Sequence, residues 1–377
     1  MESVEVVNAN IIYPKGFKNS IPEDFDAEWI GKIPFDGDKM FESIKKSKTI
    51  YDIMGTKKVE EDDKTFVIIQ DGGVGDAICA SAMIESAKKH FPEKTLVVGS
   101  SHPEVLELNP YIDHLYHLGS PGDLFERWVK PLNWFGSVIK RDIYNACAHK
   151  LFPGPLAMIW CYLYGVPYLG DDHVKIFLTE KEEKDAIDFL KTFPRPVVIV
   201  HGTGAKLVFD PKVQITPNKD YFYDYWTEIV RELTKDFDVI QIGGANEEQI
   251  PGVTTYMMGT ISIRQTAALI KHSLTHVCID SICNHLSAGV GNKGVVLFGR
   301  SNPYIAGHRS NVNVWVEGSC EFNDFGCGRP QGYFGDSEMF RGIRRPWVCP
   351  TRSCMRALTP AIIYSEVMKV ISEKLQK

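Results

Sequence analysis

The chain lacks a hydrophobic run long enough to cross a membrane. Its longest apolar stretch, residues 155–166, holds about a dozen residues, whereas a membrane-spanning helix needs about 20. The acidic start, Met1-Glu2-Ser3-Val4-Glu5, also lacks the basic-then-apolar layout of a secretory signal. These absences predict a cytoplasmic protein with at most peripheral membrane contact.

The chain also lacks an excess of basic residues and a dinucleotide-binding fingerprint. The formal net charge is −6, which gives no electrostatic basis for nucleic acid as a partner. No G-x-G-x-x-G follows a strand with an acidic residue at the expected distance, and this disfavours a dehydrogenase. The composition, 44% hydrophobic and 24% charged over 377 residues, is typical of a globular protein with two domains.

The pattern of strands and helices predicts an N-terminal extension followed by two similar α/β domains. Residues 1–63 contain scattered prolines and a charged run, and we expect little regular structure there. Strands then alternate with helices in 64–192 and again in 193–359, with a break at Phe193-Pro194-Arg195-Pro196. Such alternation is typical of doubly wound parallel sheets. We expect the C-terminal helix, 360–377, to pack back on the first domain.

The turn Gly72-Gly73-Val74-Gly75-Asp76 joins the first expected strand, 66–70, to the first expected helix, 77–91. A strand, a glycine turn and a helix N-terminus form a polar pocket for a ligand. This turn places a carboxylate at the helix mouth, where a phosphate-binding turn would present bare backbone N–H groups. The acid therefore indicates proton abstraction or hydroxyl binding. The alternative is that Asp76 only caps the helix.

Seven segments together resemble the heptosyltransferase-type glycosyltransferases of family 9, which have the GT-B fold. They cover roughly residues 65–375 in the family's order: Gly75-Asp76 with the helix that stops at His90-Phe91-Pro92, Asn109-Pro110-Tyr111-Ile112-Asp113, His201-Gly202-Thr203-Gly204, Gly243-Gly244-Ala245-Asn246-Glu247, Asp280-Ser281-Ile282-Cys283-Asn284-His285, Leu297-Phe298-Gly299-Arg300-Ser301-Asn302-Pro303 and Cys354-Met355-Arg356-Ala357-Leu358-Thr359-Pro360. The resemblance implies two Rossmann-like domains that face a cleft and a sugar nucleotide similar to ADP-heptose as donor.

The resemblance implies that Asp76 is the base that deprotonates an acceptor hydroxyl, so that the reaction inverts the anomeric carbon. Gly72, Gly73 and Gly75 then belong to the acceptor site. No metal or other cofactor is required for this chemistry, because lysine and helix N-termini can supply the positive field.

The donor site is implied in the second domain. The turn with Thr203 and Gly204 can offer a hydroxyl and N–H groups to a diphosphate. A lysine should follow, but the family's Lys-x-Trp-Pro is not intact here. Lys206, Lys212 and Lys219 compete for the role, and we favour Lys212 over Lys206.

Further donor contacts are implied at the ends of two later strands. Glu247 matches an acid that contacts the ribose, and a carboxylate on a ribose diol has a clear physical logic. Asp280, Ser281 and His285 match residues near sugar and phosphate. Ile282 stands where the family has glycine. Isoleucine does not easily adopt a positive φ, and its side chain narrows the approach of a ligand to the backbone.

Nine cysteines are present, and four lie together in the segment 320–354: Cys320, Cys327, Cys349 and Cys354. Their spacing, C-x6-C, 21 residues and C-x4-C, is looser than in zinc ribbons, but four thiolates can close a tetrahedral, structural Zn or Fe site. Some family members that modify proteins carry iron in this region. The alternative is four reduced thiols in a loop.

The sequence thus predicts a transferase that moves a heptose-like sugar from a nucleoside-diphosphate sugar to a hydroxyl of a glycan, a lipid-linked glycan or a protein, with oligomerisation open. Two alternatives remain: a GT-B transferase with another sugar-nucleotide donor, and an inactive binding or assembly protein that keeps the fold.

Overall fold

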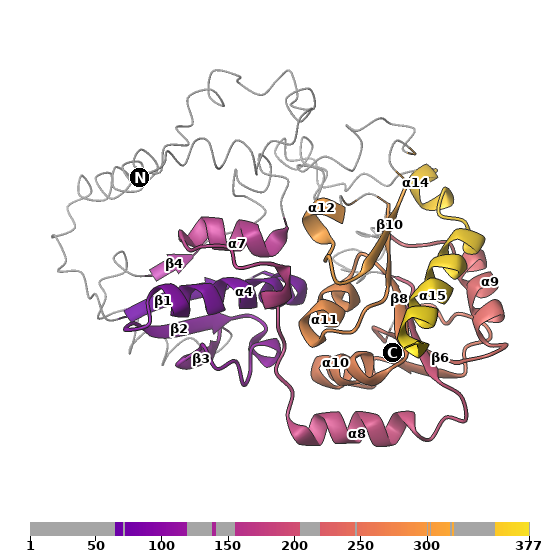
Figure 1. The fold of residues 1–377 in the computed structure, drawn as a ribbon, viewed down its shortest axis with the longest axis horizontal. Coiled ribbons are helices and arrows are strands. Elements are labelled where there is room, and N and C mark those ends of the chain that lie inside the picture. Colours follow the sequence, from indigo (N-terminus) through magenta and orange to yellow (C-terminus); the bar gives the residue numbers. More distant parts are fainter. Residues whose placement is uncertain are drawn as a thin grey trace.

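The structure is a computed structural model, and it describes residues 65–70, 72–118, 138–140, 155–203, 219–245, 247–299, 301, 303–316, 319 and 351–376. Within these residues the chain forms two parallel sheets, each flanked by helices (Figure 1). The two α/β domains expected from the alternation of strands and helices are therefore present. The N-terminal extension 1–63 lies outside the described residues.

The first sheet has four parallel strands in the order β3-β2-β1-β4. Its strands are β1 Thr65–Gln70, β2 Thr95–Ser100, β3 His114–His117 and β4 Val138–Lys140. The central strands β1 and β2 are buried along most of their length, as is typical of parallel sheets covered on both faces. Helices α4 (Val74–His90) and α7 (Leu156–Tyr164) pack on each other and on the face of the sheet that carries Phe66 and Ile68.

The second sheet has six parallel strands in the order β10-β9-β8-β5-β6-β7. These strands are β5 Val197–His201, β6 Asp238–Gly243, β7 Thr255–Met258, β8 Thr275–Ile279, β9 Val295–Phe298 and β10 Val312–Trp315. Alternate side chains of β5 enter different cores: Val197 and Ile199 face one side, Val198 and Val200 the other. Because successive side chains of a strand point to opposite faces, this one apolar strand packs against the helices on both sides of the sheet.

The helices of the second domain cover both faces of its sheet. Helices α10 (Ile263–His272) and α11 (Ile282–Val290) lie on the face toward the first domain, and α9 (Tyr223–Leu233) and α15 (Pro360–Leu375) lie on the other (Figure 1). Short helices η2 Pro103–Val105, η4 Asp171–His173, α12 Pro303–Ala306 and α14 Ser353–Arg356 complete the described part.

The C-terminal helix α15 corrects our expectation, since it packs on α9, β8 and β9 of the second domain and not on the first. Its buried residues Ile363, Val367, Val370 and Ile371 share a core with Trp226 of α9. The spacing of these apolar residues is that of one helix face, and the sequence does not show which sheet that face covers.

Helix α8 (Glu180–Leu190) also corrects the domain boundary that we placed after residue 192. It packs on α10 of the second domain, and its Glu183 forms an ion pair of 2.5 Å with Lys271. The chain therefore passes between domains before α8, and the proline-containing break at 193–196 is the turn from α8 into β5.

The two domains meet where α4 packs on α11, and one apolar core runs across this junction. Gly75 of α4 makes the approach possible, because a Cβ there would lie 2.5 Å from Cδ2 of His285 on α11. The junction thus fixes the start of α4 against α11.

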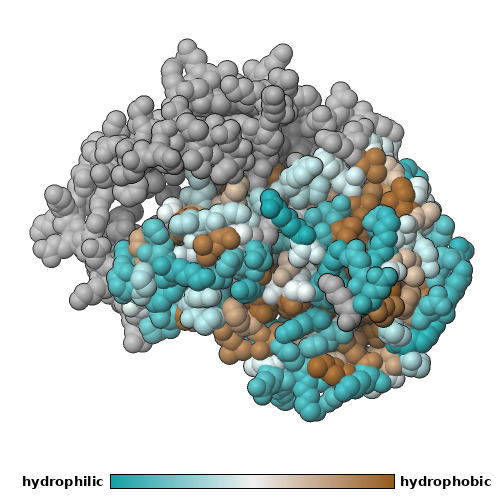
Figure 2. Space-filling model, viewed as in Figure 1, coloured by the Kyte–Doolittle hydropathy of each residue, from teal (hydrophilic) through white to brown (hydrophobic). Residues whose placement is uncertain are grey.

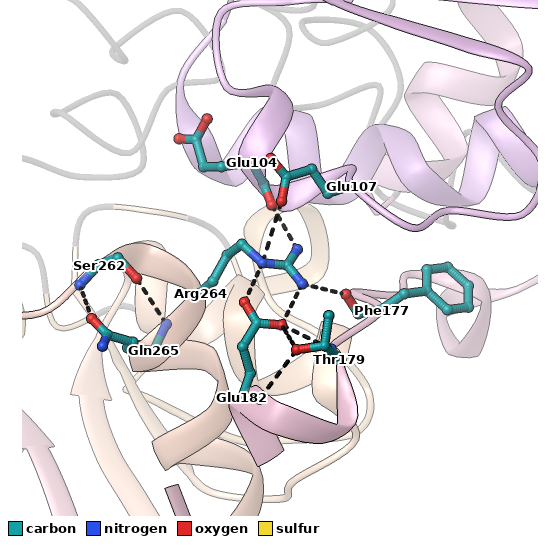
Figure 3. A network of polar contacts seen from close by, with 8 residues as sticks. All are labelled: Glu104, Glu107, Phe177, Thr179, Glu182, Ser262, Arg264 and Gln265. Carbon is teal, nitrogen blue, oxygen red and sulfur yellow. Dashed lines mark hydrogen bonds and ion pairs between the residues drawn. The ribbon is translucent and has the colours of Figure 1, made fainter. Parts of the chain in front are cut away.

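A buried arginine provides polar contacts at the same junction (Figure 3). Arg264 at the start of α10 binds both carboxylate oxygens of Glu182, at 2.6 and 2.7 Å. It also donates to the backbone oxygens of Glu104 in the first domain and Phe177 in the connecting segment, each at 2.9 Å. One guanidinium therefore links both domains and the chain between them, which suits its fixed fork of five N–H donors.

Figure 2 shows a mainly hydrophilic surface over the described part of this face, including the lower edge where α8 lies, with hydrophobic residues in small patches. Among the helices that the structure describes, none has the length and hydropathy to cross a bilayer.

Candidate functional site

Asp76 sits in the first turn of α4, and its carboxylate is bound by the turn that precedes it. Oδ2 of Asp76 accepts a hydrogen bond of 3.0 Å from the backbone N–H of Gly73, and the residue is only 4% exposed. Asp76 therefore does cap the start of α4.

The glycines of this turn leave room for the two side chains that meet there. A Cβ on Gly72 would lie 2.8 Å from Oδ2 of Asp76 and 3.1 Å from Nε2 of Gln70, and a Cβ on Gly75 would collide with His285. Among the described residues, Nε2 of the fully buried Gln70 has no hydrogen-bond partner. The turn therefore combines a carboxylate with an unpaired donor, a suitable pair for an incoming hydroxyl.

A second polar cluster forms at the carboxyl ends of β5, β6 and β8, and His201 is its centre. Nδ1 of His201 lies 2.8 Å from Oγ of Ser281, and Nε2 lies 3.4 Å from Oε1 of Glu247. Thr203 donates to Oε2 of Glu247 at 2.6 Å, and the N–H of Gly244 donates to Oε1 at 2.6 Å. Three predicted donor-site residues, Thr203, Glu247 and Ser281, thus come together around one histidine.

The charges in this cluster stabilise each other. Burial disfavours the charged form of His201, but Cys283 and Glu247 outweigh it and hold the pKa of His201 well above its usual value. Burial likewise works to raise the pKa of Glu247, but the hydrogen bond and charge of His201, with the bonds from Gly244 and Thr203, lower it. The structure therefore favours a buried His201⁺–Glu247⁻ pair.

Asp280, directly after β8, binds Lys219 at 2.7 Å between Oδ2 and Nζ. Both side chains are largely buried, at 4% and 14% exposure. Burial alone would raise the pKa of Asp280, but the charge and hydrogen bond of Lys219 lower it. Lys219 was one of the three lysines that competed for the phosphate, and it is the one that the described structure places against a predicted donor residue.

Helix α11 begins directly after Ser281, and Ile282 takes its first helical position. Among the described residues, only Leu108 and Arg352 combine a side chain with a positive φ, so Ile282 needs no glycine-like backbone. A positive φ, the condition that would make isoleucine unsuitable here, is therefore not required of Ile282. The start of α11 keeps its N–H groups at the strand edge beside Asp280.

His285 lies in the domain junction, where its ring meets Gly75 and Cys79 of α4, and it is close enough to Asp280 and Lys219 to feel their charges. Burial, with the charge of neighbouring His308, lowers the pKa of His285 to about 3, which makes the ring neutral. Its Nδ1 lies 3.4 Å from Sγ of Cys79 and 2.9 Å from Nε2 of His308.

Several predicted site residues lie outside the described residues: Gly204, Lys206, Lys212, Cys320, Cys327 and Cys349. Cys354 is described and buried, 7% exposed, and a Cβ on Gly299 would lie 3.2 Å from its Sγ. The four-cysteine metal site thus stays a prediction.

Sequence reasoning did not name His201 as a site residue, and it named Lys219 as a competitor without choosing it. His201 was visible as the last residue of a buried strand, directly before Gly202-Thr203, which is where parallel sheets place ligand contacts. Lys219 had no such signal, because its partner Asp280 is 61 residues away.

Comparison with known families agrees with this architecture. Residues 173–321 match the model of glycosyltransferase family 9 (heptosyltransferase). Over these residues the match confirms the resemblance to family 9, and with it the expectation of a glycosyltransferase. A search of curated proteins gave no match.

Solved structures give the fold of the whole. The glycosyltransferase family 9 protein of Veillonella parvula aligns with a TM-score of 0.59 at 14% identity, over 84% of this chain and 100% of that one. ADP-heptose lipopolysaccharide heptosyltransferase II of E. coli aligns at 0.55 and 13%, over 83% and 99%. The iron-containing, dodecameric glycosyltransferase TibC of enterotoxigenic E. coli aligns at 0.59 and 15%, over 83% and 77%. At these identities the likeness establishes the GT-B fold.

Proposed function

We propose that this protein transfers a sugar from a nucleoside-diphosphate sugar to an acceptor hydroxyl, with inversion at the anomeric carbon. The observation that carries the proposal is the pairing of two unlike strand-end sites. One places the carboxylate of Asp76 at the start of α4, close to Nε2 of Gln70, and the other gathers Lys219, His201 and the start of α11. A single displacement needs a base on the acceptor side and positive charge on the leaving-group side.

The reaction would proceed in one step. The acceptor oxygen forms a bond to the anomeric carbon while the bond from that carbon to the diphosphate oxygen breaks. The hydroxyl proton passes to Asp76, and the nucleoside diphosphate leaves with the bonding electron pair. Lys219 and the N–H groups at the start of α11 stabilise its charge, with Lys212 or Lys206 as further candidates, and Glu247 holds the ribose.

The donor we propose is ADP-heptose or a close analogue. Support comes from the names of two fold neighbours, an ADP-heptose transferase and a TibC complex with ADP-D-beta-D-heptose. A transferase with another nucleotide and an inactive binding protein remain the alternatives. The regular helical position of Ile282 removes one argument for the inactive protein.

Calorimetric titration with ADP, UDP and GDP tests the donor site. We expect ADP to bind most tightly and Glu247→Gln to weaken it about 10-fold, since one charge-assisted hydrogen bond contributes roughly 1.5–3 kcal/mol. Glu248→Gln, on the exposed neighbour, is the matched control. Preference for UDP or GDP would reassign the donor.

Turnover is tested by release of ADP from ADP-heptose with glycan, lipid-linked glycan and peptide acceptors. Release that depends on one acceptor class supports the transferase and identifies the acceptor. Tight ADP binding without release under any of these conditions would favour the binding protein.

A further inference from the structure

Three metal-ligating side chains from both domains converge inside the junction between α4 and α11. Cys79 comes from α4, His285 from α11, and His308 from the segment after α12. All are buried, with exposures of 0%, 8% and 4%. Sγ of Cys79 and one ring nitrogen of each histidine all lie within 4.8 Å of one another.

A single hydrogen bond at Nδ1 of His285 does not account for both of its contacts. An imidazole nitrogen has one in-plane direction, which holds either a lone pair or an N–H. Nδ1 of His285 nevertheless faces two partners, Sγ of Cys79 at 3.4 Å and Nε2 of His308 at 2.9 Å. One nitrogen cannot direct a linear hydrogen bond to both, whereas a single cation between the three atoms would satisfy all of them.

We propose that Cys79, His285 and His308 bind a zinc-class divalent cation that joins the two domains. One thiolate and two imidazoles form a borderline-soft donor set suited to Zn²⁺. Zn–N bonds of about 2.0 Å and a Zn–S bond of about 2.3 Å place tetrahedral ligand atoms roughly 3.3–3.6 Å apart. The two measured separations lie within about half an ångström of those values, so small side-chain shifts suffice.

The surroundings of His285 support the assignment. Gly75 admits the Cδ2 edge of the ring, so that the opposite edge, with Nδ1, points toward Cys79 on the same helix. With three protein ligands, one tetrahedral position is left for water or another oxygen.

The consequence for the protein is mechanical. Cys79 lies one turn after Asp76 on α4, and His285 lies one turn into α11 after Asp280. A cation held by both helices would fix the acceptor-side acid relative to the donor-side acid. This site is distinct from the predicted cluster of cysteines at 320–354.

Zinc binding tests the proposal without sugar nucleotide, so its outcome is independent of the proposed function. The full chain is prepared with Cys327 and Cys349 replaced by serine, which disables the other thiol cluster, and is stripped with a chelator. Zn²⁺ is then titrated against a competing dye, and X-ray absorption identifies the ligands. We expect one equivalent of zinc with one sulfur and two imidazole nitrogens, and a higher melting temperature on binding.

Two variants and a control make the test specific. In this background Cys79→Ser and His308→Gln should each lose more affinity than the roughly 100-fold that outer-shell changes cost. Cys161→Ser, on an equally buried cysteine of α7, should bind as the parent does. If one variant fails to fold, the other still decides. Absence of zinc binding in the parent, ligands without sulfur, or unchanged binding in a folded variant would overturn the site.

Discussion

The two acid-bearing turns, one after β1 and one after β8, share the same strand–turn–helix design but balance their carboxylates differently. Asp76 is bound by an N–H of its own turn, three residues away. Asp280 is bound by Lys219, which lies 61 residues away. Both residues are 4% exposed, so burial does not distinguish them, whereas these two contacts do.

The two turns therefore orient their acids in different ways. The Gly73 N–H, in the same turn, orients the carboxylate of Asp76. Lys219 neutralises Asp280, and His201⁺ likewise faces Glu247⁻. The second strand edge therefore holds cations whose charges are balanced by neighbouring carboxylates. Charge added there by a diphosphate would meet groups that are already oriented, and preorganised charges stabilise a leaving group most effectively.

Asp76→Asn should have the largest effect on this comparison. Asparagine still accepts the Gly73 N–H but cannot take a proton, so we expect kcat/KM to fall roughly 10²–10⁴-fold. The melting temperature and the affinity for ADP should stay near wild type, because the cap and the second domain are unchanged. Initial rates of ADP release measure the effect. Near-normal turnover would reduce Asp76 to a cap and remove the contrast between the turns.

Lys219→Met tests whether the second turn depends on its lysine. Removal of one partner of a largely buried pair leaves Asp280 unpaired, at a cost of roughly 3 kcal/mol in the free energy of unfolding. The double variant Lys219→Met/Asp280→Asn should recover most of that stability but not the affinity for ADP. Urea denaturation and calorimetry separate the two. Full ADP affinity in the double variant would exclude Lys219 from the donor site.

The pH dependence of this pair follows from the lowered pKa of Asp280, whose ordinary value is 3.8. A lowered pKa means that the pair contributes its full stability above that value and loses it as the pH falls below. The advantage of wild type over Lys219→Met should therefore shrink in acid. An advantage that is constant down to strongly acidic pH would contradict the ion pair.

Much of this architecture could be predicted from the sequence because the strands and helices carry strong local signals. The first expected strand, 66–70, became β1, and the first expected helix, 77–91, became most of α4. The edge strands β7 (Thr255–Met258) and β10 (Val312–Trp315) were missed, since both are short and only partly buried. At an edge, pairing with a neighbour decides the conformation, and local residue preference decides little.

The candidate site was predictable only where its residues follow strands directly. Asp76, Glu247 and Asp280 stand at strand ends, which the order of elements reveals. The partners that set their charge, Lys219 and His201, and the junction contacts of His285 depend on which distant segments meet. A single sequence holds no record of those pairings, and for the same reason α8 and α15 were assigned to the wrong domain.

Arg264→Lys tests whether the polar contacts of Arg264 fix the turn after β1 relative to the turn after β8. Lysine keeps the charge but loses the two-point grip on Glu182 and at least one bond to Glu104 or Phe177. We expect a loss of about 1–2 kcal/mol in the free energy of unfolding, measured by urea denaturation, and a larger loss for Arg264→Met.

The same contact predicts a pH dependence. The bidentate bond from Arg264 lowers the pKa of Glu182 from an ordinary 4.5 to about 2. The difference between wild type and Arg264→Met should therefore be full above pH 4.5 and shrink toward pH 2. Stability unchanged in both variants would show that the apolar junction alone sets the relation.

The smallest effect we predict is a change in the titration of His201, and it tests the donor-side half of the contrast. Burial opposes the charge, and Cys283 and Glu247 raise the pKa of His201. Glu247→Gln removes one of these two groups, so the pKa of His201 should fall, but not all the way to its ordinary value.

The pH dependence of stability follows from the raised pKa of His201 in the folded state. The protonated histidine stabilises the protein fully below its unfolded pKa of about 6.5. That stabilisation is lost as the pH rises through the folded pKa. Glu247→Gln should therefore lose this stabilisation at a lower pH than wild type. In Glu248→Gln, His201 should titrate as it does in wild type. Imidazole resonances followed by NMR measure the shift directly. If His201 titrated alike in all three proteins, Glu247 would not sustain a cation there, and the second turn would owe its positive character to Lys219 alone.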